Sequence, residues 1–322
     1  MTRLTGIDGT KGPHRWVVLS GVWLIYFSFG LTVAALGPLV TPITQDLRMT
    51  FGEMGTVLGA WPLIYILAAL PCGFLIDRIG PRKGLLIAAV IMGLSGLLRS
   101  AADTHLTLFL AVAIFGLGGP LISVGAPKVI ALLFQGKNRG LAMGIYITGP
   151  GLGGVVAISI SNSVLLPFFD DNWRLVTCGY GVFTLLSGII WLLLSHNKAG
   201  KFIKTAVSND ANDPIVQTFK RLAAIPSVQL VLVLSIGIFF INHGLNNWLP
   251  EIIRAHGMSA SSAGYWASIP TAASVLSALI IPRYAIPEKR ILILGLLIAS
   301  SCIATLLLQV APGPLMLFGL VL

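Results

Sequence analysis

The sequence predicts an all-α polytopic membrane protein, and three observations support this prediction. Hydrophobic residues make up 56% of the 322-residue chain and charged residues 10%, whereas about 25% of residues are charged in a typical soluble domain. Eight runs contain no Asp, Glu, Lys or Arg, and each exceeds the roughly 20 residues that a helix needs to cross the hydrocarbon. No alternating strand pattern is present, and backbone groups in lipid must be paired internally, so we expect helices. The runs cover 16–45, 54–76, 104–127, 140–169, 175–197, 222–250, 255–282 and 291–322.

A ninth span is shorter and a tenth only begins. Residues 84–98 fall short of a full span, but Arg99 can snorkel to the interface and the small residues after it extend the helix. The Pro-Gly-Pro sequence at 312–314 breaks the last run. We therefore expect nine full spans and the start of a tenth at residues 315–322.

The placement of positive charge predicts the orientation. Five segments on one side of the predicted membrane hold sixteen Lys and Arg residues, and the opposite side holds four. Positive residues favour the cytoplasmic side, so we expect a multi-pass protein of the cell (inner or plasma) membrane with a cytoplasmic N-terminus. The net charge of +10 then reflects contact with anionic lipid, and no nucleic-acid partner is expected. The cytoplasmic segments are 1–15, 77–83, 137–139, 198–221 and 283–290.

The chain divides into two unequal membrane parts. Residues 1–197 are predicted to form an N-terminal six-helix transmembrane bundle. Residues 198–226 are polar and predict a cytoplasmic linker, and residues 227–322 form an incomplete C-terminal transmembrane bundle. At the start of the second span, Thr50 and Glu53 have the spacing of a capping box.

A short, charged turn joins the second and third spans. Residues 73–83 read Gly-Phe-Leu-Ile-Asp-Arg-Ile-Gly-Pro-Arg-Lys, which resembles the signature loop of the major facilitator superfamily, a class of secondary transporters. The resemblance implies the superfamily fold and a cytoplasmic latch that joins the two halves and breaks during transport. The alternative is that the basic residues only fix the topology. The matching positions are Gly73, Asp77, Arg78, Gly80, Arg82 and Lys83.

The fifth span carries a second resemblance. Its glycines fit the spacing of the superfamily's glycine-rich fifth-helix motif except at Ile145. Glycines at this density allow close helix packing, and a proline frees a backbone carbonyl and bends the helix. We interpret the residues as a packing hinge, formed by Gly149, Pro150, Gly153 and Gly154.

The resemblance also bears on the length of the chain and on the solute site. The superfamily fold has twelve spans, so we expect this sequence to be truncated, although a genuine short product is the alternative. By analogy, the first, fourth, seventh and tenth spans line the central cavity. In the fourth span, Lys128 is the one charged residue well inside an apolar run. It is predicted either to bind an anion or to snorkel toward the inner headgroups.

Polar and aromatic residues supply the other candidates for the solute site. Four polar residues near the end of the seventh span are spaced so that they share one side of a helix. They are able to bind an oxyanion, and the histidine to carry a proton; interhelical hydrogen bonding is the alternative. The candidates are Asn242, His243, Asn246 and Asn247, with Trp23, Tyr26 and Tyr146 as wall residues.

These features predict a secondary active transporter that moves a small polar or anionic solute by alternating access, coupled to protons. The first half looks closest to cyanate-, nitrite- or nitroimidazole-type permeases. One alternative is a non-transporting sensor or assembly protein that reuses the fold. Another is a drug exporter, although no Asp or Glu lies in the middle of a span to attract a cation. We expect no enzyme, cofactor or metal site, because nucleophile–base pairs and phosphate-binding loops are missing from the sequence. The expected partners are the solute, a proton and lipid, and a monomer is favoured.

Overall fold

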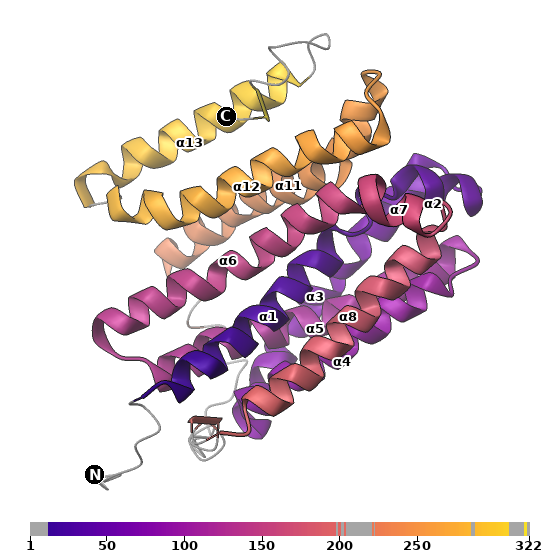
Figure 1. The fold of residues 1–322 in the computed structure, drawn as a ribbon. Helices are drawn as coiled ribbons and strands as arrows, with labels where there is room; N and C mark the ends of the chain where they lie inside the picture. Colours follow the sequence, from indigo (N-terminus) through magenta and orange to yellow (C-terminus); the bar gives the residue numbers. More distant parts are fainter. Residues whose placement is uncertain are drawn as a thin grey trace, which may run out of the picture.

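The computed structural model describes residues 12–197, 199–200, 203, 221, 223–284, 287–308 and 319–320. The predicted all-α membrane fold is confirmed (Figure 1). Among the described residues, six helical stretches, all in the first half, are long and apolar enough to cross a membrane. The first-half helices are α1 (His14–Ala34), α2 (Val40–Asp46), α3 (Phe51–Ile79), α4 (Pro81–Ser100), α5 (His105–Leu133), α6 (Gly136–Ile160), α7 (Leu166–Phe168) and α8 (Trp173–Leu194).

The second half contributes three long helices in the described residues. They are α11 (Pro226–Ala255), α12 (Ala260–Tyr284) and α13 (Arg290–Leu307). A π-helical segment, Ser161–Leu165, extends α6, and a short 3-10 helix, Pro287–Lys289, precedes α13. The predicted linker and the predicted start of a tenth span lie almost wholly outside the described residues.

The first predicted span is shorter in the structure than in the sequence analysis. The run 16–45 contains α1, which ends at Ala34, and the separate seven-residue helix α2. Gly37 and Pro38 lie between them, and a Gly-Pro pair favours a break in the helix, whereas single prolines such as Pro62 and Pro150 lie inside continuous helices. The charge-free run therefore located the membrane segment correctly but overestimated the length of its helix.

Helix ends follow their local sequence. At the start of α3, the Glu53 N–H donates to Thr50 Oγ1 (3.2 Å) and the Thr50 N–H donates to Glu53 Oε2 (2.8 Å), so the predicted capping box is confirmed. The turn from α3 to α4 consists of Gly80 alone, with φ +83°. A residue with a Cβ is strained at this φ, which explains the glycine.

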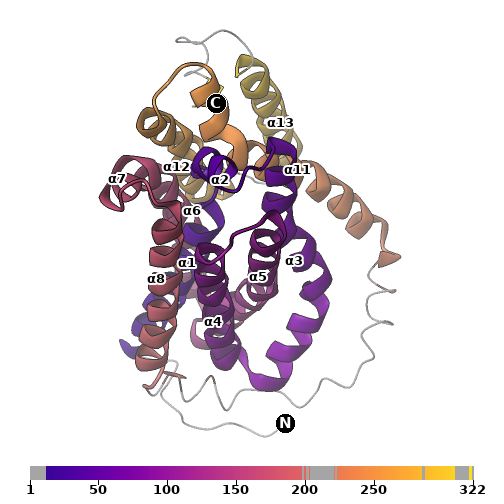
Figure 2. The same ribbon diagram turned by 90° about the vertical axis from the view of Figure 1, so that its right-hand side faces the viewer.

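The N-terminal bundle has a continuous apolar core. Here α1 packs mainly against α6 and α8, α3 against α5, and α4 against both α5 and α8. Figures 1 and 2 both show α12 alongside α6, so the second half approaches the first across this helix pair. Arg99 departs from the prediction, because its side chain does not snorkel but is buried inside the bundle, with 2% exposed.

Candidate functional site

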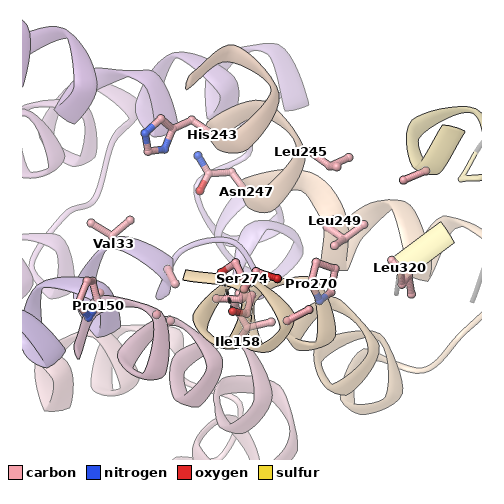
Figure 3. Close-up of a pocket in the computed structure, with 18 of the residues that line it drawn as sticks. Val33, Pro150, Ile158, His243, Leu245, Asn247, Leu249, Pro270, Ser274 and Leu320 are labelled. Carbon is pink, nitrogen blue, oxygen red and sulfur yellow. Dashed lines mark hydrogen bonds between the residues drawn. The ribbon is translucent and has the colours of Figure 1, made fainter. Parts of the chain in front are cut away.

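A cavity of about 520 Å³ lies between the two halves of the chain (Figure 3). Its walls come from α1 and α6 of the first half and from α11, α12 and α13 of the second. None of the described lining residues is Asp, Glu, Lys or Arg. A bound solute would therefore meet a largely apolar wall with a small number of neutral donors and acceptors. The polar lining residues are His243, Asn247, Thr271, Ser274, Ser277 and Ser301.

Two of the predicted solute residues, His243 and Asn247, line this cavity. Figure 3 shows both directed from α11 toward the side on which Val33 lies. They are four residues apart and so share a face of the helix. The predicted residues Asn242 and Asn246 lie on α11 as well, but their side chains are outside the described part of the structure.

Aromatic rings fix the orientation of the His243 imidazole. The ring stacks on Phe239, with centroids 5.6 Å apart, and meets the Trp61 ring edge-on at 5.0 Å. Trp61 in turn packs against Phe29, which lines the cavity from α1. These contacts leave the histidine half-buried at the cavity wall, a position from which it can hydrogen-bond a solute.

The predicted wall residues Trp23, Tyr26 and Tyr146 lie outside the described cavity lining. They belong to the contact between α1 and α6. The Trp23 indole N–H donates to Thr148 Oγ1 (3.0 Å), and the rings of Tyr26 and Tyr146 are 5.4 Å apart. In this conformation their contacts are those of helix packing.

Lys128 also lies away from the cavity. Its ammonium donates to Asp77 Oδ1 at 2.5 Å, which joins the fourth span to the charged turn. Arg82, in the same turn, donates from Nε to Ser195 Oγ (2.9 Å) and from Nη2 to His196 Nδ1 (3.2 Å). These contacts of the predicted latch are all made within the first half. The other latch positions, Gly73, Arg78, Gly80 and Lys83, lie on or beside the same turn.

The predicted hinge lies where α6 crosses α1. A Cβ on Gly153 would meet the Phe27 carbonyl and lie 2.7 Å from the Leu31 nitrogen. A Cβ on Gly149 would lie 3.1 Å from the Trp23 carbonyl oxygen. The two backbones therefore touch, which requires glycine at Gly153 and leaves little room for a larger residue at Gly149. Pro150 and Gly154 of the same helix line the cavity.

The two halves are joined by hydrogen bonds at the end of the bundle opposite Asp77. Thr41 Oγ1 donates to Glu251 Oε2 at 2.7 Å, and Arg254 donates to the same carboxylate oxygen at 3.2 Å. Ser261 Oγ lies 3.5 Å from the Asn162 carbonyl oxygen, which it faces as a donor. Among the described residues, no hydrogen bond or ion pair joins the halves at the Asp77 end.

A second polar network holds that opposite end of the N-terminal bundle. Arg174 forms ion pairs with Asp46 and, at 3.2 Å, with Asp103. The Trp173 indole N–H also donates to Asp46 (3.0 Å). The hydrogen bonds from Arg174 and Trp173 lower the pKa of the Asp46 carboxyl below its usual value. The sequence analysis did not identify this network, because its members lie far apart in the chain.

A polar stripe on α12 was also missed. Thr271, Ser274 and Ser277 are three residues apart and all line the cavity. Their spacing places them near one face of a helix that is otherwise largely apolar, so the sequence carried this signal.

The comparisons agree with the fold. A family profile described as Major Facilitator Superfamily matches residues 22–322. A bacterial homolog of the human lysosomal transporter Spinster, solved in an inward-facing and occupied conformation, superposes with a TM-score of 0.73. It is 20% identical, and the match covers 97% of this chain and 71% of that one.

Several curated relatives carry the names of solutes. The probable L-galactonate transporter of Escherichia coli (strain K12) is 26% identical over 71% of this chain and 52% of its own length. The 4-hydroxybenzoate transporter of Pseudomonas aeruginosa is 25% identical over 83% of this chain and 65% of its own length. The chain thus spans less than two thirds of either relative. The family match over nearly its whole length shows that the chain belongs to the Major Facilitator Superfamily.

Proposed function

We propose that the protein is a secondary carrier that moves a small carboxylate solute across the membrane by alternating access. The observation that carries the proposal is the uncharged cavity, with six polar side chains in its wall, between two halves whose described hydrogen bonds to each other all lie at one end. Superfamily membership supports transport, and the relatives named for L-galactonate, 4-hydroxybenzoate and galactarate/D-glucarate carry the names of organic acids, while a relative from Nostoc punctiforme is named for nitrate and nitrite. All of these relatives are named as transporters, which supports the expectation that the protein is a transporter and not an enzyme.

The cavity chemistry suits a carboxylate. Its volume of about 520 Å³ is in the range of small-molecule sites. The Asn247 amide and the Ser277 hydroxyl are able to donate hydrogen bonds to the solute oxygens, whereas the Ser274 hydroxyl donates to the Thr271 carbonyl oxygen (2.7 Å). His243 is the titratable group of the described lining, and its imidazole is the group that we propose to carry the coupled proton.

The ion pair between Asp77 and Lys128 supports a role for Lys128 in the latch. With a cytoplasmic N-terminus, the Asp77 end faces the cytoplasm, and the described hydrogen bonds between the halves lie on the far side. The conformation is then inward-facing, with the latch open and the Asp77 carboxylate held by Lys128 within its own half. We place this carrier in the cell membrane as a monomer.

Uptake into proteoliposomes tests the proposal. Labelled 4-hydroxybenzoate, galactonate and nitrate are offered with and without an inward proton gradient. Saturable uptake of at least one acid that rises with the gradient is the expected result. His243→Gln should abolish the stimulation by protons, whereas His105→Gln, at a helix start away from the cavity, should not. Binding without flux for every acid would favour a sensor and contradict the proposal.

The same assay separates the two roles of Lys128. If Lys128 serves the latch, Lys128→Ala and Asp77→Asn lower the rate of uptake to a similar degree and leave the solute affinity unchanged. If Lys128→Ala loses affinity for the solute and Asp77→Asn does not, Lys128 binds the solute rather than serving the latch.

A further inference from the structure

A buried arginine without an acidic partner lies beside the candidate site. The Arg99 side chain is 2% exposed, and among the described residues no carboxylate lies within 4.0 Å of it. Its Nη1 donates to the Thr32 carbonyl oxygen at 2.9 Å. Its Nε is buried with no hydrogen-bond partner in the described structure. Neither contact supplies a negative charge, so the guanidinium stays a net positive charge inside the bundle.

Aromatic rings link this charge to the cavity. The guanidinium carbon is 5.2 Å from the centroid of Phe115, and Phe115 stacks on Phe29 with centroids 5.4 Å apart. Phe29 lines the cavity, as does Val33, the neighbour of the residue whose carbonyl binds Arg99. The medium between the charge and the cavity is thus hydrocarbon and aromatic, which screens a charge weakly.

Two other cations of the described chain, one near each end of the interface between the halves, each have a carboxylate partner. Lys128 is paired with Asp77, and Arg254 with Glu251. The cavity lining itself carries no fixed charge in its described residues. The electrostatic potential in the cavity is therefore set largely by the group that lacks a counter-ion, Arg99.

We propose that Arg99 determines the charge selectivity of the cavity by acting through space, so that anions enter and bind in preference to neutral and cationic molecules. The inference rests on the proposed function for the role of the cavity and names its substrate class. At an effective dielectric constant of about 20, a unit charge on the order of 10 Å from a monoanion changes the occupancy by that anion about tenfold. Arg99 touches no solute in this arrangement; its role is in specificity.

A thiol reporter tests the potential directly. Val33→Cys is introduced on a background in which Cys72, Cys178 and Cys302 are replaced by alanine. The reporter is reacted with a sulfonate-bearing and a trimethylammonium-bearing methanethiosulfonate, and the ratio of the two rates is measured. Arg99→Met should lower the anion-to-cation ratio at least tenfold, and Arg99→Lys should keep it within about twofold.

Two further measurements guard against indirect effects. A reporter at the exposed Asn138, at the start of α6 and outside the predicted spans, should show a ratio that Arg99→Met leaves unchanged. On the parent Arg99 chain, the Val33→Cys ratio should survive an increase to about 0.5 M salt, because a buried charge is screened much less than surface charges. The salt measurement can be made even if Arg99→Met does not fold, because it uses the parent Arg99 chain.

The outcomes separate this inference from the proposed function. An unchanged ratio in Arg99→Met, or a parent ratio that collapses in salt, overturns the role of Arg99 even if acids are transported. A tenfold fall in the ratio supports that role even if no acid of the panel is taken up, in which case only the proposed transport fails.

Discussion

Replacing Gly153 with alanine should destabilise the protein, because the added methyl has no room. Gly153 lies where α6 touches α1, and its Cβ would lie 2.7 Å from the Leu31 nitrogen and closer still to the Phe27 carbonyl oxygen. Non-bonded carbon contacts are optimal at about 3.5–4.0 Å. The two helices would have to separate by about 1 Å, and both obstacles are backbone atoms that cannot rotate away.

The magnitude follows from two opposing effects. Overpacking of a close contact costs typically about 1–3 kcal/mol. Alanine in a helix interior returns about 0.8–1.0 kcal/mol relative to glycine. We therefore expect Gly153→Ala to lower the free energy of unfolding by up to about 2 kcal/mol.

Gly59→Ala is the matched control. Gly59 lies inside α3, and a Cβ there would meet nothing within 4 Å, so this variant keeps the gain in helix propensity without the clash. Thermal unfolding of the purified protein in detergent, followed by circular dichroism, compares the two variants with the parent. If Gly153→Ala unfolds at or above the temperature of Gly59→Ala, the close contact between α1 and α6 is not as the structure describes it.

Three further predictions test the cavity and the contacts at the end of the bundle opposite Asp77. A short reducible cross-linker between Thr41→Cys and Glu251→Cys should stop uptake, and reduction should restore it; uptake that continues in the cross-linked carrier would show that these halves need not separate. The lowered pKa of Asp46 means that the ionised carboxyl stabilises the folded state above its unfolded pKa, near 3.8. Asp46→Asn should thus lower the unfolding temperature at pH 7, and the difference should vanish as the pH falls below about 3.8 through the folded-state pKa; a difference that persists in acid would exclude the ion pair with Arg174 as its source. Proton-driven uptake should be lost in His243→Phe while exchange of solute without a gradient continues, since the ring can pack in place of the imidazole but cannot carry a proton.

The fold could be predicted from the sequence because it depends on run lengths. A helix must be about 20 apolar residues long to cross the bilayer, and charge-free runs report this directly. Local chemistry also sufficed for helix ends, as Thr50 and Glu53 show. The break after α1 was missed because residues 35–45 carry no charge, and a charge-free run does not register the Gly37-Pro38 pair that favours the break.

The candidate site could be predicted only in part. His243 and Asn247 were found because polar residues in an apolar run are conspicuous. Lys128 was equally conspicuous, but its partner Asp77 lies 51 residues away, and sequence spacing alone does not reveal such a pairing. The polar stripe of Thr271, Ser274 and Ser277 on α12 was missed because hydroxyl residues are common in membrane helices, where they can bond to their own helix backbone as Ser274 does.

Arg99 shows that the direction of a side chain follows from the helix face rather than from distance to the membrane edge. It lies in the last turn of α4, where a long basic side chain usually snorkels. The small or buried residues of the same helix, Ala88, Met92 and Ser95, precede it at steps of four and three residues. The next step of four reaches Arg99, on the face that packs into the bundle. Helical spacing therefore predicts a buried guanidinium, and the stability cost of burying it without an acid suggests that its charge is retained for what it does to the adjoining cavity.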